Sequence, residues 1–223
     1  MSINIVEKID TLVPVKNVLI SVSDKRSLET FVPALIEMIP NIQIISTGGT
    51  YQKIKDILVS ENNLVLISNI TGQPETQGGL VKTLDFKIYL GLLTETYNEA
   101  HQKDLERTQA SPIDMVVVNL YPFEQTISKE GVTIEQARGN IDIGGPCMIR
   151  ASAKNFLRVA SVVDPMDYPD ILEDIRKNKG CTSLKKRFEL AKKAFGHTHA
   201  YDANIHQYLN EQVFEDVAAC YHT

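Results

Sequence analysis

The chain has 223 residues, which suits one large domain or one domain with a helical appendage. Its 23 basic and 28 acidic residues give a net charge of −5, so we expect no general attraction to nucleic acid or acidic membranes. The three scattered cysteines argue against a disulfide framework and for a reducing compartment. Residues 1–10 lack a signal-peptide core and no apolar run could span a bilayer, so we expect a cytoplasmic protein.

Short apolar runs rich in β-branched residues predict the strands of a sheet. They occupy residues 18–22, 42–46, 64–68, 88–93, 115–120 and 159–163. Most of them do not alternate with polar residues, as expected for strands that are covered on both faces. Between them, residues 28–39 and 51–57 carry apolar side chains at helical spacing. The alternation predicts an α/β fold, a three-layer sandwich around a mostly parallel sheet.

The last part of the chain has a helical pattern. From residue 184, four apolar side chains fall at i, i+4, i+7 and i+11, an amphipathic helix: Leu184, Phe188, Ala191 and Phe195. A second helix is expected to turn four more side chains inward: Ile205, Leu209, Val213 and Phe214. We therefore predict an α/β domain over residues 1–178 and a helical extension, residues 179–223, packed on it.

Polar residues follow two of the predicted strands, and an open parallel sheet binds its ligands at the carboxyl ends of its strands. The first group is Ser23, Asp24 and Lys25, and the second is the run Ser46-Thr47-Gly48-Gly49-Thr50. Each precedes a helix, and helix-start N–H groups with hydroxyls and a lysine suit a phosphate. Ser and Thr there are also common N-caps, which is the structural alternative to a phosphate site.

Three more groups have both a structural and a functional interpretation. Asn119 is either a turn cap or a hydrogen-bonding clamp, and Tyr121 either covers the core or donates into a cleft. Lys82 can bind phosphate or polarise a carbonyl. The histidines at 197, 199 and 206 lack the spacing of ligands on one helix face, so we expect no metal site.

The segment from Ile141 to Asn155 carries the strongest chemical signal. It places Asp142 beside the pair Gly144-Gly145, with Lys154 twelve residues after the aspartate. A glycine pair lets the backbone approach a ligand closely. An Asp and a Lys held close together can shift each other's pKa and exchange a proton near neutral pH. A surface loop with a solvated Asp and Lys is the alternative.

Seven segments in order resemble the IMP cyclohydrolase domain of the bifunctional AICAR transformylase/IMP cyclohydrolase family. They are LISVSDK (19–25), STGGT (46–50), ITGQPE (70–75), GGLVKTL (78–84), NLYPF (119–123), IDIGGPCMIRASAKN (141–155) and AFGHTHAYD (194–202). The resemblance implies a methylglyoxal-synthase-like fold and the ring closure of formyl-AICAR, with loss of water, to IMP. It implies a homodimer and no metal or redox cofactor. If the chain is complete, a separate AICAR transformylase must supply the substrate.

The resemblance also implies roles for individual residues. Those that hold the nucleotide, chiefly its phosphate, are Ser23, Asp24, Lys25, Thr47, Gly48, Gly49 and Thr50. Those that line the base and ribose are Lys82, Thr83, Val118, Asn119, Asp142 and Ile143, and further substrate-binding residues are Leu80, Val81 and Gly144. The catalytic group is Lys154, Asp142, Tyr121 and Lys82. Asp142, relayed by Lys154 or Tyr121, moves protons, and Lys82 or an N–H near Gly144 stabilises the formyl oxygen.

The chain departs from the family pattern at the loop around Lys82. Leu80 stands where the family has an arginine, Asp85 replaces a histidine, and Phe86 replaces a proline. The lost arginine weakens phosphate binding unless another cation, such as Lys87, compensates. A nucleotide-binding or regulatory module that has lost turnover is therefore the alternative function. Methylglyoxal synthase activity on dihydroxyacetone phosphate is a third, which the IDIGG and NLYPF segments disfavour.

Overall fold

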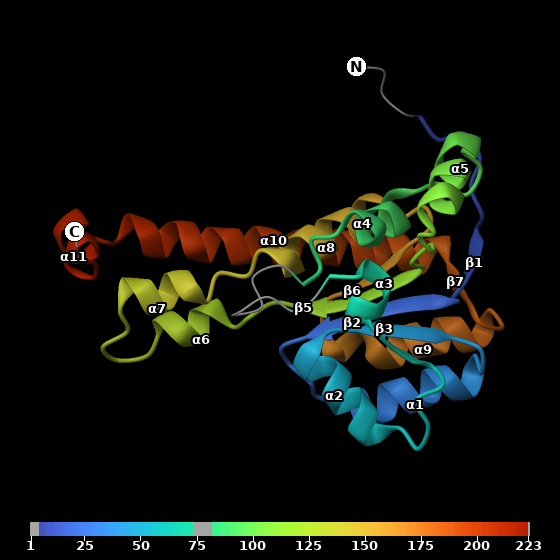
Figure 1. Ribbon diagram of the computed structural model, residues 1–223, viewed down its shortest axis with the longest axis horizontal. Helices are drawn as coiled ribbons and strands as arrows, with labels where there is room; N and C mark the ends of the chain where they lie inside the picture. The colour runs from blue at the N-terminus through green and yellow to red at the C-terminus, as the bar shows by residue number, and fades with distance from the viewer. Residues whose placement is uncertain (1–4, 74–81, 223) are drawn as a thin grey trace.

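The computed structural model describes residues 5–73 and 82–222, and a five-stranded parallel sheet lies at its centre (Figure 1). Across the sheet the strands are β4 (Leu64–Leu66), β3 (Gln43–Ser46), β2 (Asn17–Val22), β5 (Met115–Asn119) and β6 (Ala160–Val162). Every neighbouring pair is parallel. All five carboxyl ends therefore meet at one edge, and this edge carries the polar groups singled out in the sequence.

Helices cover both faces of the sheet, and the predicted α/β sandwich is confirmed. One face packs against α1 (Leu28–Met38), α2 (Gly48–Ile57) and α9 (Tyr168–Lys177), which follows the short 3-10 helix η2 (Pro165–Asp167). The other packs against α3 (Ile67–Thr71), α4 (Phe86–Leu93) and α8 (Gly144–Lys154), with α5 (Glu99–Thr108) farther out. Side chains alternate along β2, so that Ile20 joins the first core and Leu19 the second.

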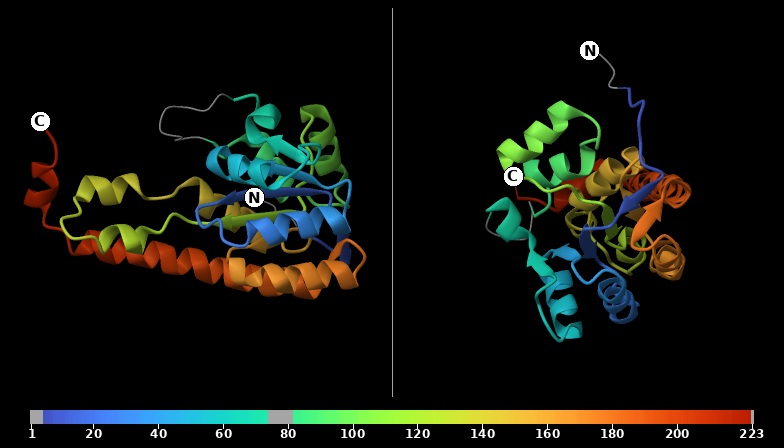
Figure 2. Two further views of the ribbon diagram at one scale, coloured as in Figure 1. Left: turned by 90° about the horizontal axis from the view of Figure 1, so that it is seen from below. Right: turned by 90° about the vertical axis from the view of Figure 1, so that its right-hand side faces the viewer.

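The long helix α10 (Leu184–Asn210) runs along α8 and the β6 edge, then extends beyond the sheet. There it is accompanied by α6 (Phe123–Ile127), α7 (Ile134–Gly139) and α11 (Phe214–Ala219), which together form the projecting arm in Figures 1 and 2. The predicted helix is confirmed, but Phe188 and Phe195 on it are exposed. The expectation that Leu209, Val213 and Phe214 face inward is wrong, because all three are exposed on the arm.

The prediction of a strand at residues 88–93 is also wrong, because this segment belongs to α4. The Asp85 carboxylate accepts a hydrogen bond of 2.8 Å from the Lys87 N–H and so caps the helix. Ile88 and Leu92, one helical turn apart, are buried in the core. Periodicity alone cannot distinguish a short buried helix from a buried strand in a six-residue apolar run.

A buried arginine joins distant parts of the chain. Arg187 on α10 is 0% exposed, and its guanidinium donates to the carbonyl oxygens of Asp10 (2.8 Å) and Phe156 (3.0 Å). It also donates to the carbonyl oxygens of Leu157 and Thr182. Burial lowers the pKa of Arg187 to about 10. The hydrogen bonds from its guanidinium to the four carbonyl oxygens compensate for the burial of its charge.

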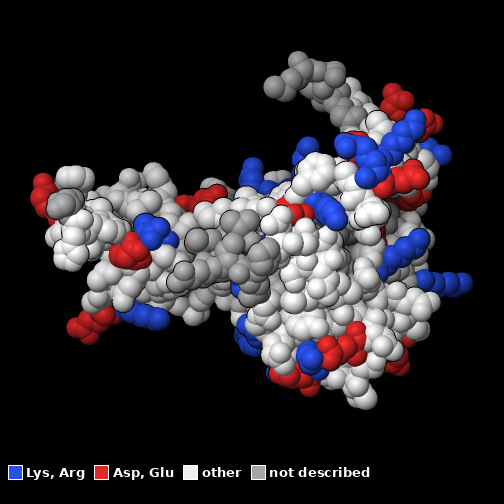
Figure 3. All heavy atoms as spheres, in the orientation of Figure 1, with Lys and Arg blue, Asp and Glu red and all other residues white. Residues whose placement is uncertain are grey.

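The predicted boundary near residue 178 stays a prediction, although contacts cross it. The strand β1 (Leu12–Pro14) pairs antiparallel with β7 (Cys181–Ser183), and α10 packs on β6. On the face shown in Figure 3, basic and acidic side chains occur side by side. Within the described ranges, the search for a helix that could cross a membrane finds none. The cytoplasmic location stays a prediction.

Candidate functional site

A pocket of about 380 Å³ lies at the carboxyl edge of the sheet. It is bounded by the ends of β2, β3 and β5, the starts of α2 and α8, and residues 82–84. Its volume is in the range of small-molecule sites. The predicted site residues that line it are Ser23, Lys25, Thr47, Gly48, Gly49, Thr50, Lys82, Thr83, Val118, Asn119, Tyr121, Asp142, Ile143 and Gly144.

A cleft of similar size, about 420 Å³, lies on the arm between α7, α10 and α11. Its lining is mostly apolar and includes Ile134, Leu209 and Phe214. Arg138, the charged residue of that lining, is already paired with Glu135 at 2.6 Å. The arm cleft therefore lacks the convergent polar groups of the sheet-edge pocket, and only the latter is suited to a phosphorylated ligand.

One end of the sheet-edge pocket is built for an anion. Thr47 precedes α2 without a side-chain cap, because its hydroxyl instead pairs with that of Ser21 at 2.9 Å. The N–H groups of Thr50 and Tyr51 already donate to the Thr47 carbonyl oxygen, so those of Gly48 and Gly49 are the ones at the helix start that a ligand beside Lys25 can use. A Cβ added to Gly49 would meet no atom within 4 Å, so the backbone there borders open space. This geometry suits a phosphate.

Asn119 and Thr50 hold the loop after β2 in place. The Asn119 Oδ1 accepts from the N–H groups of Ser23 (2.7 Å) and Asp24 (2.8 Å), and its Nδ2 donates to the Asp24 carbonyl at 3.0 Å. The Thr50 hydroxyl donates to the Val22 carbonyl at 3.0 Å and accepts from the Val22 N–H at 3.1 Å. Asn119 thus holds the protein's own backbone, as the turn-cap interpretation expected, and its role as a clamp on a ligand stays a prediction.

Asp24 does not line the pocket. Its carboxylate lies against the guanidinium of Arg26, at 2.8 Å from Nε and 2.5 Å from Nη2. These hydrogen bonds hold the pKa of Asp24 below its ordinary value. Of the nucleotide-binding residues expected in the first loop, Asp24 therefore contributes its backbone and not its carboxylate. Leu80 and Val81 lie outside the described residues.

The opposite end of the pocket is formed by Asp142, at the junction between α7 and α8. Its Oδ1 accepts a hydrogen bond of 2.9 Å from the Gly145 N–H, and the Tyr121 N–H also donates to this carboxylate. Burial raises the pKa of Asp142, while the two N–H donors act in the opposite direction. A carboxyl group with a raised pKa is better matched to proton transfer at neutral pH than an ordinary aspartate.

The glycine pair beside Asp142 is closely packed. A Cβ added to Gly145 would lie 2.5 Å from Asp142 Oδ2 and 2.7 Å from Leu120 Cδ2. A Cβ added to Gly144 would lie 2.6 Å from Thr83 Oγ1. The expected close approach of a ligand to this pair stays a prediction, and both glycines line the pocket. The structure shows that the close neighbours are side chains of the protein itself.

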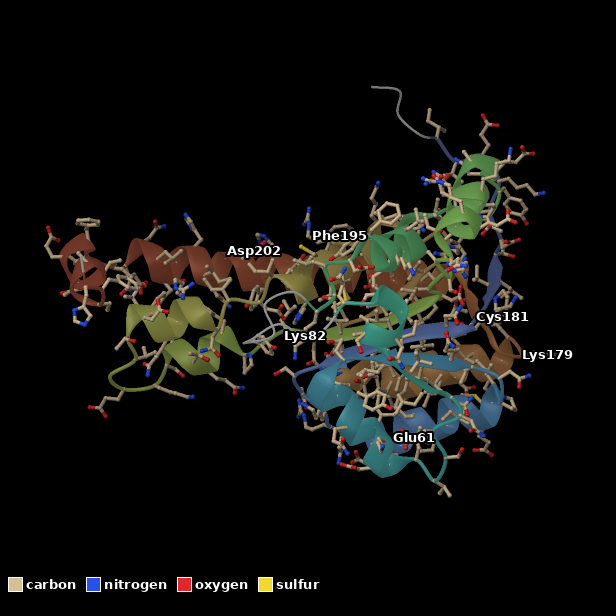
Figure 4. The ribbon with its side chains drawn as sticks, viewed as in Figure 1. Glu61, Lys82, Lys179, Cys181, Phe195 and Asp202 are labelled. Atoms are coloured by element: carbon tan, nitrogen blue, oxygen red, sulfur yellow. The ribbon has the colours of Figure 1, made fainter. Side chains whose placement is uncertain are left out.

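Lys82 and Tyr121 complete the acid–base end of the pocket. Both line it together with Asp142, and Figure 4 shows Lys82 beside the end of β5. Tyr121 is 53% exposed and is part of the pocket lining. An ammonium, a phenol and a carboxylate around one cavity can stabilise a developing oxyanion and transfer protons.

Lys154 is not brought into this pocket. It is the last residue of α8, is exposed, and is absent from the pocket lining. At 1.5 Å per residue, the ten steps from Gly144 carry it about 15 Å along the helix. The spacing of twelve residues therefore separates Lys154 from Asp142 within one chain. Its catalytic role stays a prediction of the resemblance.

The sequence analysis missed Ser21 and Tyr201. Ser21 lines the pocket, and its signal was a polar residue within an apolar strand. The Tyr201 hydroxyl accepts a hydrogen bond of 2.7 Å from the Asp142 N–H. Its position on the buried side of a long helix is the same as that of an ordinary core residue. Among the residues that the structure describes, no cluster of three or more His, Cys, Asp or Glu could hold a metal.

Comparison with known families shows to which family the chain belongs. The MGS-like domain matches residues 27–147, more than half of the chain. The chain belongs to this family. Residues 152–222, which include the last turn of α8 and all of α10, match the family described as AICARFT/IMPCHase bienzyme.

Similar proteins extend the comparison. The chain is 51% identical over 207 residues to the bifunctional purine biosynthesis protein PurH of Thermoanaerobacter sp. (strain X514), covering 92% of this chain and 40% of that protein. It is 49% identical over 203 residues to PurH of Bacillus subtilis (strain 168), covering 90% and 38%. The crystal structure of ForH superposes with a TM-score of 0.71 at 30% identity, over 86% of this chain and 97% of that one. The resemblance drawn from the seven segments is confirmed.

Proposed function

We propose that this chain is an IMP cyclohydrolase, which closes formyl-AICAR to IMP with loss of water in purine biosynthesis. One observation carries the proposal: a single pocket has an anion-binding end at α2 and an acid–base end at Asp142. The similarity to PurH supports the choice of substrate. Because the chain spans 40% of the length of the PurH relative from Thermoanaerobacter, the activity is a proposal for this chain.

The two ends of the pocket suit the two ends of the substrate. The phosphate dianion would accept hydrogen bonds from the start of α2 and lie beside Lys25. The imidazole with its carboxamide and formamide arms would then reach toward Lys82, Tyr121 and Asp142. Binding energy from the remote phosphate can in this way orient the reacting groups.

The reaction needs one new bond and the transfer of protons. The carboxamide nitrogen attacks the formyl carbon, a C–N bond forms, and the nitrogen gives up a proton, for which Asp142 is the acceptor. The formyl oxygen gains negative charge, which Lys82 or an N–H at the start of α8 stabilises. The oxygen takes up this proton, with Tyr121 as relay. It then leaves as water with a second proton from the formamide nitrogen, as the C–O bond breaks and a C=N bond forms. Nucleophile and electrophile belong to one molecule, so positioning supplies much of the acceleration.

Purified chain incubated with formyl-AICAR tests the proposal. We expect IMP to form in the absence of any folate or second protein, as measured by chromatography of the products. The Asp142→Asn variant is the control for contaminating activity, because it keeps the size of the side chain. Absence of IMP formation by folded protein would refute the proposal.

A nucleotide-binding module without turnover is the second candidate, and two observations favour it. Lys154 lies outside the pocket, and Asp85 is used to cap α4. The anion-binding end would then retain a nucleotide that the acid–base end cannot transform. Calorimetric binding of IMP by a chain that shows no turnover would establish this function, and turnover would exclude it. The same preparation with dihydroxyacetone phosphate tests methylglyoxal synthase activity, which we expect to be absent.

Two partners implied by the resemblance belong to the proposal. A second copy of the chain would form a homodimer, which light scattering measures directly. A separate AICAR transformylase would supply formyl-AICAR, so the chain alone should convert formyl-AICAR and leave AICAR with a formyl donor unchanged. Conversion of AICAR and the donor by the chain alone would contradict the need for that partner.

A further inference from the structure

The loop that carries Asp142 rests against the long helix α10. Residues 140–143 connect α7 to α8, and Tyr201 lies 59 positions after Asp142 in the sequence. Tyr201 is 8% exposed, and its ring points into the core beneath the loop. Its hydroxyl lies 2.7 Å from the Asp142 nitrogen and 3.5 Å from the Asn140 carbonyl oxygen.

These contacts fix Asp142 from two directions. The backbone N–H of Asp142 donates to the Tyr201 hydroxyl, and the carboxylate accepts from the Gly145 N–H. The first contact comes from α10 and the second from the first turn of α8. Without the hydroxyl, the half-buried N–H would lose this acceptor, and an unsatisfied donor drives a local rearrangement. The carboxylate would then be placed only by the N–H groups of Gly145 and Tyr121.

Tyr201 is itself held rigidly and contacts the segment that carries Tyr121. Its ring lies edge-on to Phe123, with ring centroids 6.3 Å apart at 70°. Phe123 is buried and follows Tyr121 by two positions. One side chain of α10 therefore contacts both segments that form the acid–base end of the pocket.

We propose that Tyr201 is a positioning residue, whose hydroxyl holds the Asp142 loop in the geometry that ring closure requires. Tyr201 does not line the 380 Å³ pocket, so it acts through Asp142 and not on the substrate. The inference rests on the proposed function, since it assigns Tyr201 to the same site. It gives the arm helix a role in the chemistry at the sheet edge.

Tyr208 provides a matched control on the same helix. It lies seven residues farther along α10, is 9% exposed, and its ring is also edge-on to Phe123, at 5.8 Å and 87°. None of the hydrogen bonds found within the described part of the chain involves its hydroxyl. Tyr208→Phe thus removes the same atom at similar burial, while the Asp142 loop is left intact.

The experiment compares Tyr201→Phe with Tyr208→Phe in the full chain. We expect Tyr201→Phe to lower kcat for formyl-AICAR about tenfold with KM within about twofold, because the loss falls on positioning of the acid–base group. Tyr208→Phe should leave both constants unchanged. Equal kcat in the two variants would overturn the proposal. Melting temperatures of both variants separate this kinetic effect from a general loss of stability.

A second measurement does not depend on turnover. Amide hydrogen exchange at Asp142 should be about tenfold faster in Tyr201→Phe than in Tyr208→Phe, because only the former removes its acceptor. If the unaltered chain makes no IMP, the proposed function fails, and the exchange rates still decide whether Tyr201 holds the loop. Equal exchange rates in the two variants would refute that role, whether or not IMP is formed.

Discussion

Two glycine pairs open two helices onto the same pocket, and they serve opposite purposes. Gly48-Gly49 begins α2, and a Cβ at Gly49 would meet only open space. Gly144-Gly145 begins α8, where added Cβ atoms would collide with Thr83 and with Asp142. The first pair leaves room for a ligand, and the second allows the protein to pack against itself. The dipeptide Gly-Gly in a sequence therefore does not show whether it provides room for a ligand or allows close packing.

The two ends of the pocket are also held in place by different kinds of contact. The anion-binding end is held by Asn119 and Thr50, which bridge the ends of strands that are neighbours in the sheet. The acid–base end is held by Tyr201, from a helix that follows all strands of the sheet in the sequence. We therefore expect the anion-binding end to tolerate changes in α10 and the acid–base end to be sensitive to them.

Among the variants that test this comparison of the two pocket ends, Asp142→Asn should have the largest effect. Removing the proton acceptor should lower kcat by about 10²- to 10⁴-fold, the usual contribution of general acid–base catalysis. IMP binding should change little, because the phosphate lies at the other end of the pocket. Steady-state kinetics and calorimetry measure the two quantities. A variant with near-normal kcat would show that Asp142 is not the acceptor.

Gly145→Ala should come next, because its new methyl group would displace Asp142 or Leu120. We expect a loss of about 1–3 kcal/mol in the free energy of unfolding, as for other overpacked positions. Because the methyl group also displaces the carboxylate, kcat should fall about tenfold or more. Denaturant titration and kinetics of the variant test both. Unchanged stability would mean that the loop relaxes without strain.

Gly49→Ala is the matched change on α2, since each glycine is the second residue of its helix. The methyl group meets no protein atom but enters the space assigned to the phosphate. We expect KM for formyl-AICAR to rise about tenfold with kcat and the melting temperature nearly unchanged, because alanine also favours a helix. If KM is unaffected, the phosphate does not bind at the start of α2.

A smaller effect concerns stability and pH. Burial raises the pKa of Asp142 in the folded chain, so the ionised form is disfavoured by folding. The stability that this group contributes is present below the ordinary Asp pKa and is lost as pH rises through the raised value. Asp142→Asn should therefore melt at a higher temperature than the unaltered chain at pH 7, and the difference should shrink toward pH 4. A constant difference across this range would contradict the assignment.

The smallest effect is expected from Lys154→Ala. The resemblance implies a catalytic role, whereas one chain places Lys154 outside the pocket at the far end of α8. From this position we expect kcat to change by less than about threefold, as for an exposed side chain remote from the reacting atoms. Kinetics on the variant decide between the two expectations. A large loss would require Lys154 to reach the pocket from a second copy of the chain.

The sheet and its ligand edge could be predicted from the sequence, because they depend on local signals. Apolar runs marked β2, β3, β4, β5 and β6, and the polar residues that follow three of them do line one pocket. The run at residues 88–93 misled because six apolar residues fit a buried helix and a buried strand equally well. The helix α4 can be recognised only from its cap at Asp85 and from its packing partners in the structure.

The contacts around Asp142 could not be predicted in the same way. Tyr201 is one of several buried side chains on α10, and only the fold shows that its hydroxyl meets the Asp142 N–H. The distance between Asp142 and Lys154 depends on where α8 begins and ends, which a spacing of twelve residues does not reveal. Long-range contacts of this kind depend on tertiary packing and not on sequence periodicity.

The guanidinium of Arg187 affects how the protein unfolds. It binds carbonyl oxygens from residues 10, 156, 157 and 182, so three separate stretches of backbone share one side chain. Separating any of these stretches from Arg187 would leave the buried guanidinium without acceptors. A buried charge that loses its partner costs about 3–5 kcal/mol. Heating should therefore melt the N-terminal strand, the sheet and α10 in one cooperative calorimetric transition.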